Sequence, residues 1–274
     1  MKGDSGVGSR RIWTLTPKSA VTVSICTTNY NCAHALPRHL SSIYRALQRF
    51  PFEYIVVDNK STDGSLGILM EWASSHENMT VRSLRCTMGE GRQVAFSSSV
   101  AQHIMVVDTD VVYDPILTAF TRRYLDAYLN LSVQALFCGI FPRDQWVRIG
   151  GRRSLNTNED LDMWFRLLQL GTMRWYPVQM GEHLKEPWAE GSADYRSARY
   201  SRPDQIFRLF RREWDLFKTR RLNRLDLSTI IQRNTLDMAL GPAPGTWPGS
   251  RKWQSLVQRA VQLTRELKQV SRKP

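Results

Sequence analysis

Apolar runs and helix-like segments alternate along the first half of the chain. Four short segments are predicted to be strands, and the most apolar of them are buried on both faces. The predicted strands are residues 21–26, 54–57, 79–84 and 104–107. Segments with apolar residues at helical spacing lie between them, and the predicted helices are residues 36–50, 65–74 and 92–102. This order predicts an α/β fold with a mostly parallel central sheet that carries helices on both faces.

The second half of the chain has a less regular pattern. Residues 131–141 are expected to return to the sheet. A glycine-rich polar loop then leads into a helix of about ten residues, which is expected to stop at Gly171. Residues 173–178 are a candidate edge strand, and residues 181–204 are expected to form a loop.

Polar clusters follow three of the predicted strands. They are TTNYN after the first strand, DNKSTDGS after the second, and DTD after the fourth. In parallel sheets, ligands bind beyond the carboxyl ends of the strands. Because three clusters point to one edge, turn formation alone does not account for them, and we predict a binding site there.

The acidic residues of these clusters suggest chemistry. Asp108 and Asp110 are one residue apart and would repel each other without a counter-charge, whereas Mg²⁺ and Mn²⁺ prefer such oxygen ligands and bridge to phosphates. Farther along, NEDLDMWFR opens a predicted helix with acids, which also suits the helix dipole. Asp162 fits that structural role, with Arg166 as its ion-pair partner. A carboxylate at the mouth of the loop, Asp160 among them, could act as a general base.

Composition and motifs narrow the classes of function. No apolar stretch is long enough to suggest a membrane span, and the first residues lack the apolar core of a secretory signal. The four cysteines form no CxxC pair, which favours reduced thiols in a cytoplasmic protein. The first strand is followed by neither a GxGxxG motif nor a glycine-rich phosphate loop, which argues against a dehydrogenase and a nucleotidyltransferase.

Positive charge is concentrated in the last quarter of the chain. Residues 201–274 hold 16 basic and 6 acidic residues, a net +10 of the total +13. Two amphipathic helices are expected there, at residues 205–221 and near the C-terminus, separated by a linker at residues 241–250. This region either docks on an anionic membrane surface or packs on the catalytic domain or a second subunit of a homodimer. No nucleic-acid motif accompanies it, so nucleic acid is not the expected partner.

Together, the strand ending in TTNYN, the segment VVDNKSTDGS, the DTD motif, the GG loop and the ED-bearing helix resemble family 2 glycosyltransferases, which have the GT-A fold. The resemblance covers about residues 20–185. It implies an inverting enzyme that uses a nucleoside-diphosphate sugar, UDP- or GDP-linked, with Mn²⁺ or Mg²⁺. The acceptor would be a hydroxyl of a glycan or lipid-linked glycan. Two departures are Thr27, where many members have Pro, and Asn59, where an Asp is common.

Matching positions imply roles for individual residues. The resemblance assigns the general base to Asp160. It assigns nucleotide-sugar binding to Thr27, Asn29, Tyr30, Asp58, Arg92 and Asp108, and within this set Asp58 binds the nucleobase. It assigns the metal to Asp108, Asp110 and His183. Four tryptophans flank the acceptor half and could stack on sugar faces or belong to the core: Trp146, Trp164, Trp175 and Trp188.

The expected organisation follows from these assignments. Residues 1–19 form a polar leader, residues 20–200 the GT-A catalytic domain, and residues 201–274 a basic helical extension. Within the catalytic domain, residues 20–115 bind the nucleotide sugar and residues 116–200 the acceptor.

The enzyme is expected in the cytoplasm, with peripheral attachment to the inner membrane face as an option. The open alternatives are transfer to a lipid phosphate and a non-catalytic basic protein that binds sugar or nucleic acid. A catalytically inactive module would be expected to lack Asp58, Asp110 or Asp160, and all three are present.

Overall fold

The computed structural model describes residues 21–156 and 159–184 of the chain. The expected leader at residues 1–19, the basic extension at residues 201–274 and most of the expected loop at 181–204 lie outside the described residues. Among the described residues, no helix is both long and apolar enough to cross a membrane. The cytoplasmic location stays a prediction.

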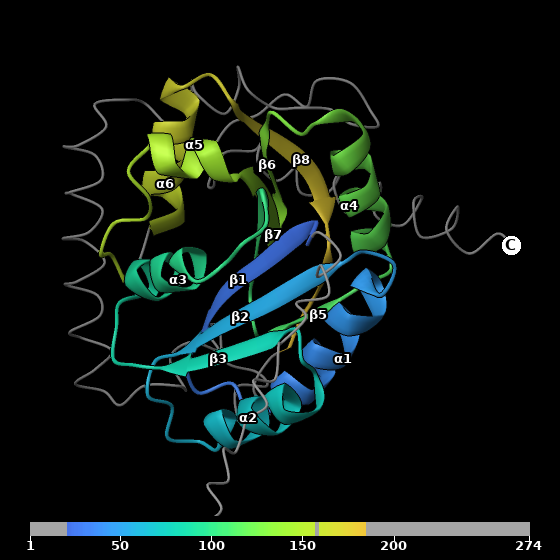
Figure 1. Ribbon diagram of the computed structural model, residues 1–274, viewed down its shortest axis with the longest axis vertical. Coiled ribbons are helices and arrows are strands. Elements are labelled where there is room, and N and C mark those ends of the chain that lie inside the picture. Colours follow the sequence, from blue (N-terminus) through green and yellow to red (C-terminus); the bar gives the residue numbers. More distant parts are fainter. Residues whose placement is uncertain (1–20, 157–158, 185–274) are drawn as a thin grey trace, which may run out of the picture.

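A seven-stranded sheet forms the centre of the described part, in the order β3-β2-β1-β4-β7-β6-β8 (Figure 1). The strands are β1 (Val23–Asn29), β2 (Phe52–Asp58), β3 (Met79–Ser83), β4 (His103–Val107), β6 (Ser132–Leu136), β7 (Cys138–Pro142) and β8 (Met173–Gln179). Only β7 runs against the others. The mostly parallel sheet is therefore confirmed, and β8 is the predicted edge strand.

Helices cover both faces of this sheet, as predicted (Figure 1). One face packs against α1 (Leu36–Leu47), α2 (Ser65–Ser75) and α4 (Ile116–Ala127), and the other against α3 (Met88–Ser97), α5 (Arg143–Arg148) and α6 (Glu159–Gln169). The apolar side chains of β1, β2 and β4 divide between the two resulting cores. These strands carry apolar residues at successive positions because both of their faces are buried.

Several elements differ from the prediction. Residues 131–141 form a hairpin, β6 and β7, that turns at Phe137. Helices α4 and α5 were not predicted. A small second sheet pairs β5 (Val111–Tyr113) with β9 (Gly181–His183), so the expected loop at 181–204 begins with a strand.

Helix α3 begins about one turn before its predicted start. The Thr87 side chain accepts from the Glu90 backbone N–H, and the Glu90 carboxylate accepts from the Thr87 N–H, which together form a capping box. Two glycines in the first turn then allow close packing. A Cβ at Gly89 would lie 2.0 Å from the Arg153 carbonyl oxygen, and one at Gly91 would lie 2.3 Å from Thr28 Cγ2. The helix could not approach the sheet and the 152–155 loop this closely with larger residues.

A buried histidine links α1 to both sheets. His39 Nδ1 lies 2.8 Å from the Val111 carbonyl oxygen, and its Nε2 lies 2.6 Å from the Tyr54 hydroxyl. The carbonyl can only accept, so Nδ1 carries the proton and Nε2 accepts from Tyr54. Burial lowers the pKa of His39 to about 4.

This histidine should make stability depend on pH. The unfolded chain binds a proton at His39 below its ordinary pKa of about 6.5, whereas the folded chain does not bind one until about pH 4. Its contribution to stability is therefore complete above about pH 6.5 and is lost as the pH falls towards 4. Replacing His39 by Gln should remove about 2 kcal/mol of the pH dependence between about pH 7.5 and pH 5. Urea unfolding at both pH values checks this, with His76→Gln as the control. Equal pH dependence in wild type and the His39 variant would contradict it.

Candidate active site

The predicted polar rim is assembled by the register of the parallel strands. Asn29, the last residue of β1, lies beside Asp58, the last residue of β2. On the other side, Cys26 pairs with Val106 of β4, so Asp108 follows at the same edge. The three polar clusters therefore meet at the carboxyl ends of the strands.

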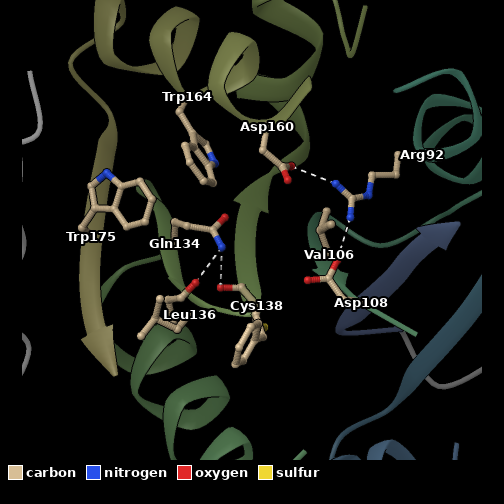
Figure 2. A pocket seen from close by; sticks show the side chains of 11 residues that line it. Arg92, Val106, Asp108, Gln134, Leu136, Cys138, Asp160, Trp164 and Trp175 are labelled. Carbon is tan, nitrogen blue, oxygen red and sulfur yellow. Dashed lines mark hydrogen bonds and ion pairs between the residues drawn. The ribbon is translucent and has the colours of Figure 1, made fainter. Parts of the chain in front are cut away.

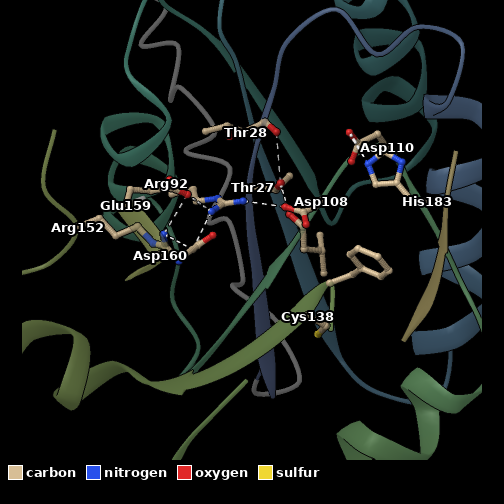
Figure 3. Close-up of polar contacts among 12 residues, drawn as sticks. Thr27, Thr28, Arg92, Asp108, Asp110, Cys138, Arg152, Glu159, Asp160 and His183 are labelled. Atoms are coloured by element: carbon tan, nitrogen blue, oxygen red, sulfur yellow. Dashed lines mark hydrogen bonds and ion pairs between the residues drawn. The ribbon is translucent and has the colours of Figure 1, made fainter. Parts of the chain in front are cut away.

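Arg92 of α3 is the most highly connected side chain at this rim, and it is buried (Figure 3). Its Nη2 donates to Asp108 Oδ1 at 2.8 Å, and its Nη1 donates to Asp160 Oδ1 at 2.9 Å. The same Nη1 also pairs with Glu159. One guanidinium thus joins the acid that follows β4 to the two acids that begin α6.

Arg152 holds the same acids from the loop before α6. Its fully buried guanidinium donates to Asp160 Oδ1 at 2.6 Å and lies 3.5 Å from Glu159 Oε1. It also lies over the Trp146 ring, 5.3 Å from the centroid. Both guanidiniums use the same oxygen of Asp160. The second oxygen, Oδ2, accepts no hydrogen bond from the described residues, and the Asp160 side chain is 37% exposed.

These contacts separate the proton affinities of the acids. Burial acts to raise the pKa of Asp160, but Arg92 and Arg152 outweigh it and hold the pKa well below its usual range. Burial and the Asp160 charge raise the pKa of Glu159 to about 7, although the same arginines oppose this. Burial raises the pKa of Asp108 to about 6 against the effect of Arg92. Asp160 is therefore ionised at neutral pH, and Glu159 is the acid that most readily retains a proton.

Asp162 has the structural role predicted for it. Its Oδ2 accepts from Arg166 Nη2 at 2.5 Å, and its Oδ1 accepts from Arg153 Nη1 at 2.6 Å. Arg166 also donates to the carbonyl oxygens of Ile149 and Gly151, both at 2.6 Å. This pair ties α6 to the glycine loop and so fixes the start of the helix that carries Asp160.

The predicted metal ligands are only partly brought together. The antiparallel pairing of β5 with β9 places His183 opposite Val111, and His183 Nε2 lies 3.2 Å from Asp110 Oδ2. Asp108 instead faces Arg92 (Figure 3). Among residues 21–156 and 159–184, no three His, Cys, Asp or Glu side chains converge as a metal site. The roles of these three residues in metal binding stay predictions.

The residues predicted to hold the nucleotide form the turns of the rim. Asp58 is fully buried; its Oδ1 accepts from Asn29 Nδ2 and Ser61 Oγ, and its Oδ2 from the Ser61 N–H at 3.0 Å. Thr27 Oγ1 donates to the Val107 carbonyl at 2.6 Å, and Tyr30 is half-buried at the end of β1. Asn29 Oδ1 is buried without a hydrogen-bond partner among the described residues. Asp58 therefore closes a turn in this structure, and its contact with a base stays a prediction.

A pocket opens between this rim and α6 (Figure 2). Its volume is about 190 Å³, with Arg92, Asp108 and Asp160 on one side and Trp164, Trp175 and Gln134 on the other. Phe137, in the β6–β7 turn, lines it with a positive φ of 70°. The Tyr113 hydroxyl fixes this turn, because it donates to the Phe137 carbonyl at 2.5 Å and accepts from the Asp108 N–H at 3.0 Å.

The sequence interpretation missed three side chains at this site: Arg152, Gln134 and Phe137. Arg152 follows the glycine pair in GGRR, and its place in the loop that leads into the acid-rich helix was the signal that could have identified it. Gln134 and Phe137 lie in a segment that was predicted only to rejoin the sheet, and no motif marks them. Arg92 was predicted beside the nucleotide; the structure places it between the two acidic groups.

Comparison with known proteins assigns the chain to a family. The family model described as "Glycosyl transferase family 2" matches residues 24–161, which is half of the chain. The chain therefore belongs to family 2 of the glycosyltransferases, enzymes with the GT-A fold, as the sequence motifs predicted. No curated protein matches the chain.

Solved structures with a similar fold include two proteins of low sequence identity. A mannosyltransferase from Pyrobaculum calidifontis, PcManGT in complex with GDP-Man and Mn²⁺, is 19% identical over 57% of this chain and 54% of that protein, with a TM-score of 0.48. S. aureus TarS is 18% identical over 53% of this chain and 33% of its own, with a TM-score of 0.47. TarS 1-349 in complex with UDP-GlcNAc is 18% identical over 53% of each chain, also at 0.47. The match spans about half of these proteins or less.

Removing Asp162 should destabilise the fold. The Asp162→Ala variant leaves the buried Arg166 guanidinium without its carboxylate, and breaking such a pair costs about 3–5 kcal/mol. Urea unfolding measures the loss. Asp126→Ala, which removes an exposed acid on α4, should change stability by less than about 0.5 kcal/mol. A variant of Asp162 as stable as this control would show that the pair does not anchor α6.

Proposed function

We propose that this chain is a metal-dependent inverting glycosyltransferase. It moves a sugar from a UDP- or GDP-sugar to a hydroxyl group of a glycan or lipid-linked glycan. Residues 20–115 bind the donor and residues 116–200 bind the acceptor. The observation that carries the proposal is the arrangement at the pocket, where Asp108 and Asp160 lie on the two sides of Arg92.

Asp160 is the proposed general base. Arg92 and Arg152 orient its Oδ1, while Oδ2 stays available on a partly exposed side chain. The acceptor oxygen attacks the anomeric carbon, and its proton passes to Asp160 Oδ2. The bond from that carbon to the diphosphate oxygen breaks, and its electron pair leaves with the nucleoside diphosphate. Attack from the face opposite to the leaving group inverts the anomeric carbon.

Asp110 and His183 are the proposed holders of a divalent cation, Mn²⁺ or Mg²⁺, with Asp108 beside them. The 3.2 Å between Asp110 Oδ2 and His183 Nε2 suits neighbouring ligands of one octahedral ion, which lie about 3 Å apart when the bonds are about 2.1 Å. Such ions are usually held by one or two protein carboxylates plus substrate phosphates, so few protein ligands suffice. When bound, the ion would neutralise charge on the departing diphosphate.

Transfer to a lipid phosphate is a second candidate, and one observation favours it. Two guanidiniums lower the pKa of Asp160, which makes it a weak base. An acceptor phosphate is already ionised near neutral pH and needs little help from a base. The effect of removing the Asp160 charge therefore distinguishes the two acceptors.

The metal assignment can be tested at Asp110. We expect Asp110→Ala to abolish sugar transfer without loss of fold, because it removes a charge at the rim and leaves both cores intact. EDTA should have the same effect on the wild type, and added Mn²⁺ should reverse it. Turnover of a panel of sugar nucleotides is the measurement. Glu182→Ala, an exposed acid beside His183 on β9, serves as the control. Full activity in EDTA would refute metal dependence.

The base assignment can be tested at Asp160. Asp160→Asn keeps the shape of the side chain but cannot take the proton. For a hydroxyl acceptor we expect kcat to fall by about 10²–10⁴, with little change in nucleotide affinity. Asp144→Asn, an exposed acid on α5, should leave kcat unchanged. A near-normal rate in the Asp160 variant would contradict the hydroxyl mechanism and support a phosphate acceptor.

A further inference from the structure

Two tryptophans form the wall of the pocket that lies farthest from the donor-side rim (Figure 2). Trp164 follows Asp160 by one turn of α6, so both side chains lie on the same face of the helix. Trp175 of β8 pairs with Gln134 of β6. The two rings are nearly perpendicular, at 77°, with centroids 4.5 Å apart. Together they make an aromatic corner next to the proposed base.

Neither indole N–H in this corner has a hydrogen-bond partner among the described residues, although both nitrogens are buried. An indole N–H can only donate, and buried polar groups without partners are uncommon in folded proteins. A perpendicular pair allows one N–H to point at the face of the other ring, which is a weak interaction. Because both nitrogens have almost no accessible surface, the corner presents the faces of its rings to a ligand.

The charge of the pocket selects against an anionic ligand. Its lining includes two carboxylates, Asp108 and Asp160, and a single cation, Arg92, among the described residues. That cation is already paired with three carboxylates. No cation lies on the aromatic side of the lining that the structure describes. A phosphate group seated there would face net negative charge, whereas a neutral ligand would not.

The size of the pocket limits the ligand to a small group. A volume of about 190 Å³ corresponds to roughly six water molecules and is below the ~300–1,000 Å³ of sites that enclose a drug-sized molecule. A single sugar ring is of this order, and a nucleotide is not. The apolar C–H face of a sugar ring can pack on an indole.

We propose that Trp164 and Trp175 form the acceptor subsite and that it takes a neutral sugar ring. The rings hold the sugar by its apolar face. Because Trp164 lies one turn from Asp160, a hydroxyl of the same sugar is presented to the base. This inference rests on the proposed function, and it names the class of acceptor: a glycan terminus and not a lipid phosphate.

The subsite can be tested first by binding, without turnover. Methyl glycosides of common hexoses and N-acetylhexosamines, with octyl phosphate as the anionic probe, are screened by saturation-transfer NMR. We expect at least one methyl glycoside to receive saturation, mainly at the C–H groups of one ring face. The signal should be lost in Trp175→Leu and kept in Trp72→Leu, which alters a half-buried tryptophan on α2. Saturation of octyl phosphate alone would overturn the proposal.

Kinetics then separate this inference from the proposed function. With the donor that the enzyme hydrolyses and the glycoside that binds, Trp164→Phe and Trp175→Phe keep an aromatic ring but lose part of its area. In at least one of them we expect the acceptor KM to rise about 3- to 10-fold, with kcat and donor hydrolysis nearly unchanged. Trp164→Leu and Trp175→Leu should each raise the acceptor KM at least about 10-fold. The Phe variants keep the test valid if the Leu variants do not fold, as judged by circular dichroism.

Failure of the subsite and failure of the proposed function give different results. If transfer occurs and depends on Asp160, but all four folded variants keep the wild-type acceptor KM, the subsite is wrong and the proposed function stands. If no sugar nucleotide is turned over, yet a glycoside binds and binding is lost in Trp175→Leu, the subsite stands and the proposed function fails.

Discussion

The arrangement of the site depends on keeping one buried cation paired. A guanidinium inside a protein is tolerated only when carboxylates and hydrogen bonds surround it, and Arg92 meets this requirement by drawing Asp108, Glu159 and Asp160 towards α3. The acids come from two distant parts of the chain, and without the cation they would repel one another. The close approach of α3 to its surroundings, which its two glycines allow, makes this convergence possible. Burial of one charge thus brings the acid that follows β4 close to the two acids that begin α6.

The sequence predicted the parallel strands and the helices between them, because the hydrophobic pattern of these segments matches how they are buried in the fold. The inner parallel strands are buried on both faces, so they appear as apolar runs, and their order with the helices indicated a parallel sheet. The elements it missed are short or depend on distant contacts. β5 and β9 have three residues each and exist through their mutual pairing. The hairpin turn at Phe137 uses a positive φ without Gly or Asn, so no turn signal was present. Gly89 and Gly91 have low helix propensity, and close packing is the reason they are there.

For the candidate site, the sequence identified individual acidic residues but not their arrangement in space. Asp108, Asp110 and Asp160 follow recognisable elements and could be identified from motifs. Their mutual geometry could not be identified from motifs, because it depends in part on partners 68 or more residues away along the chain, as for Arg92 with Asp160 and Asp110 with His183. The low proton affinity of Asp160 also follows only from the two guanidiniums that share its Oδ1. Sequence reasoning therefore identified several of the groups, and the structure defined their electrostatic relations.

The Tyr113 hydroxyl has a consequence for how the two substrates influence each other. One oxygen atom holds both the backbone of Asp108, on the proposed donor side, and the turn at Phe137, on the proposed acceptor side. A donor that shifts the first segment changes the energy of the second, and an acceptor does the reverse. Thermodynamic linkage requires the two effects to be equal in free energy. In the proposed function, the two substrates are therefore coupled through a single phenol, and the strength of that coupling is the same whichever of them binds first.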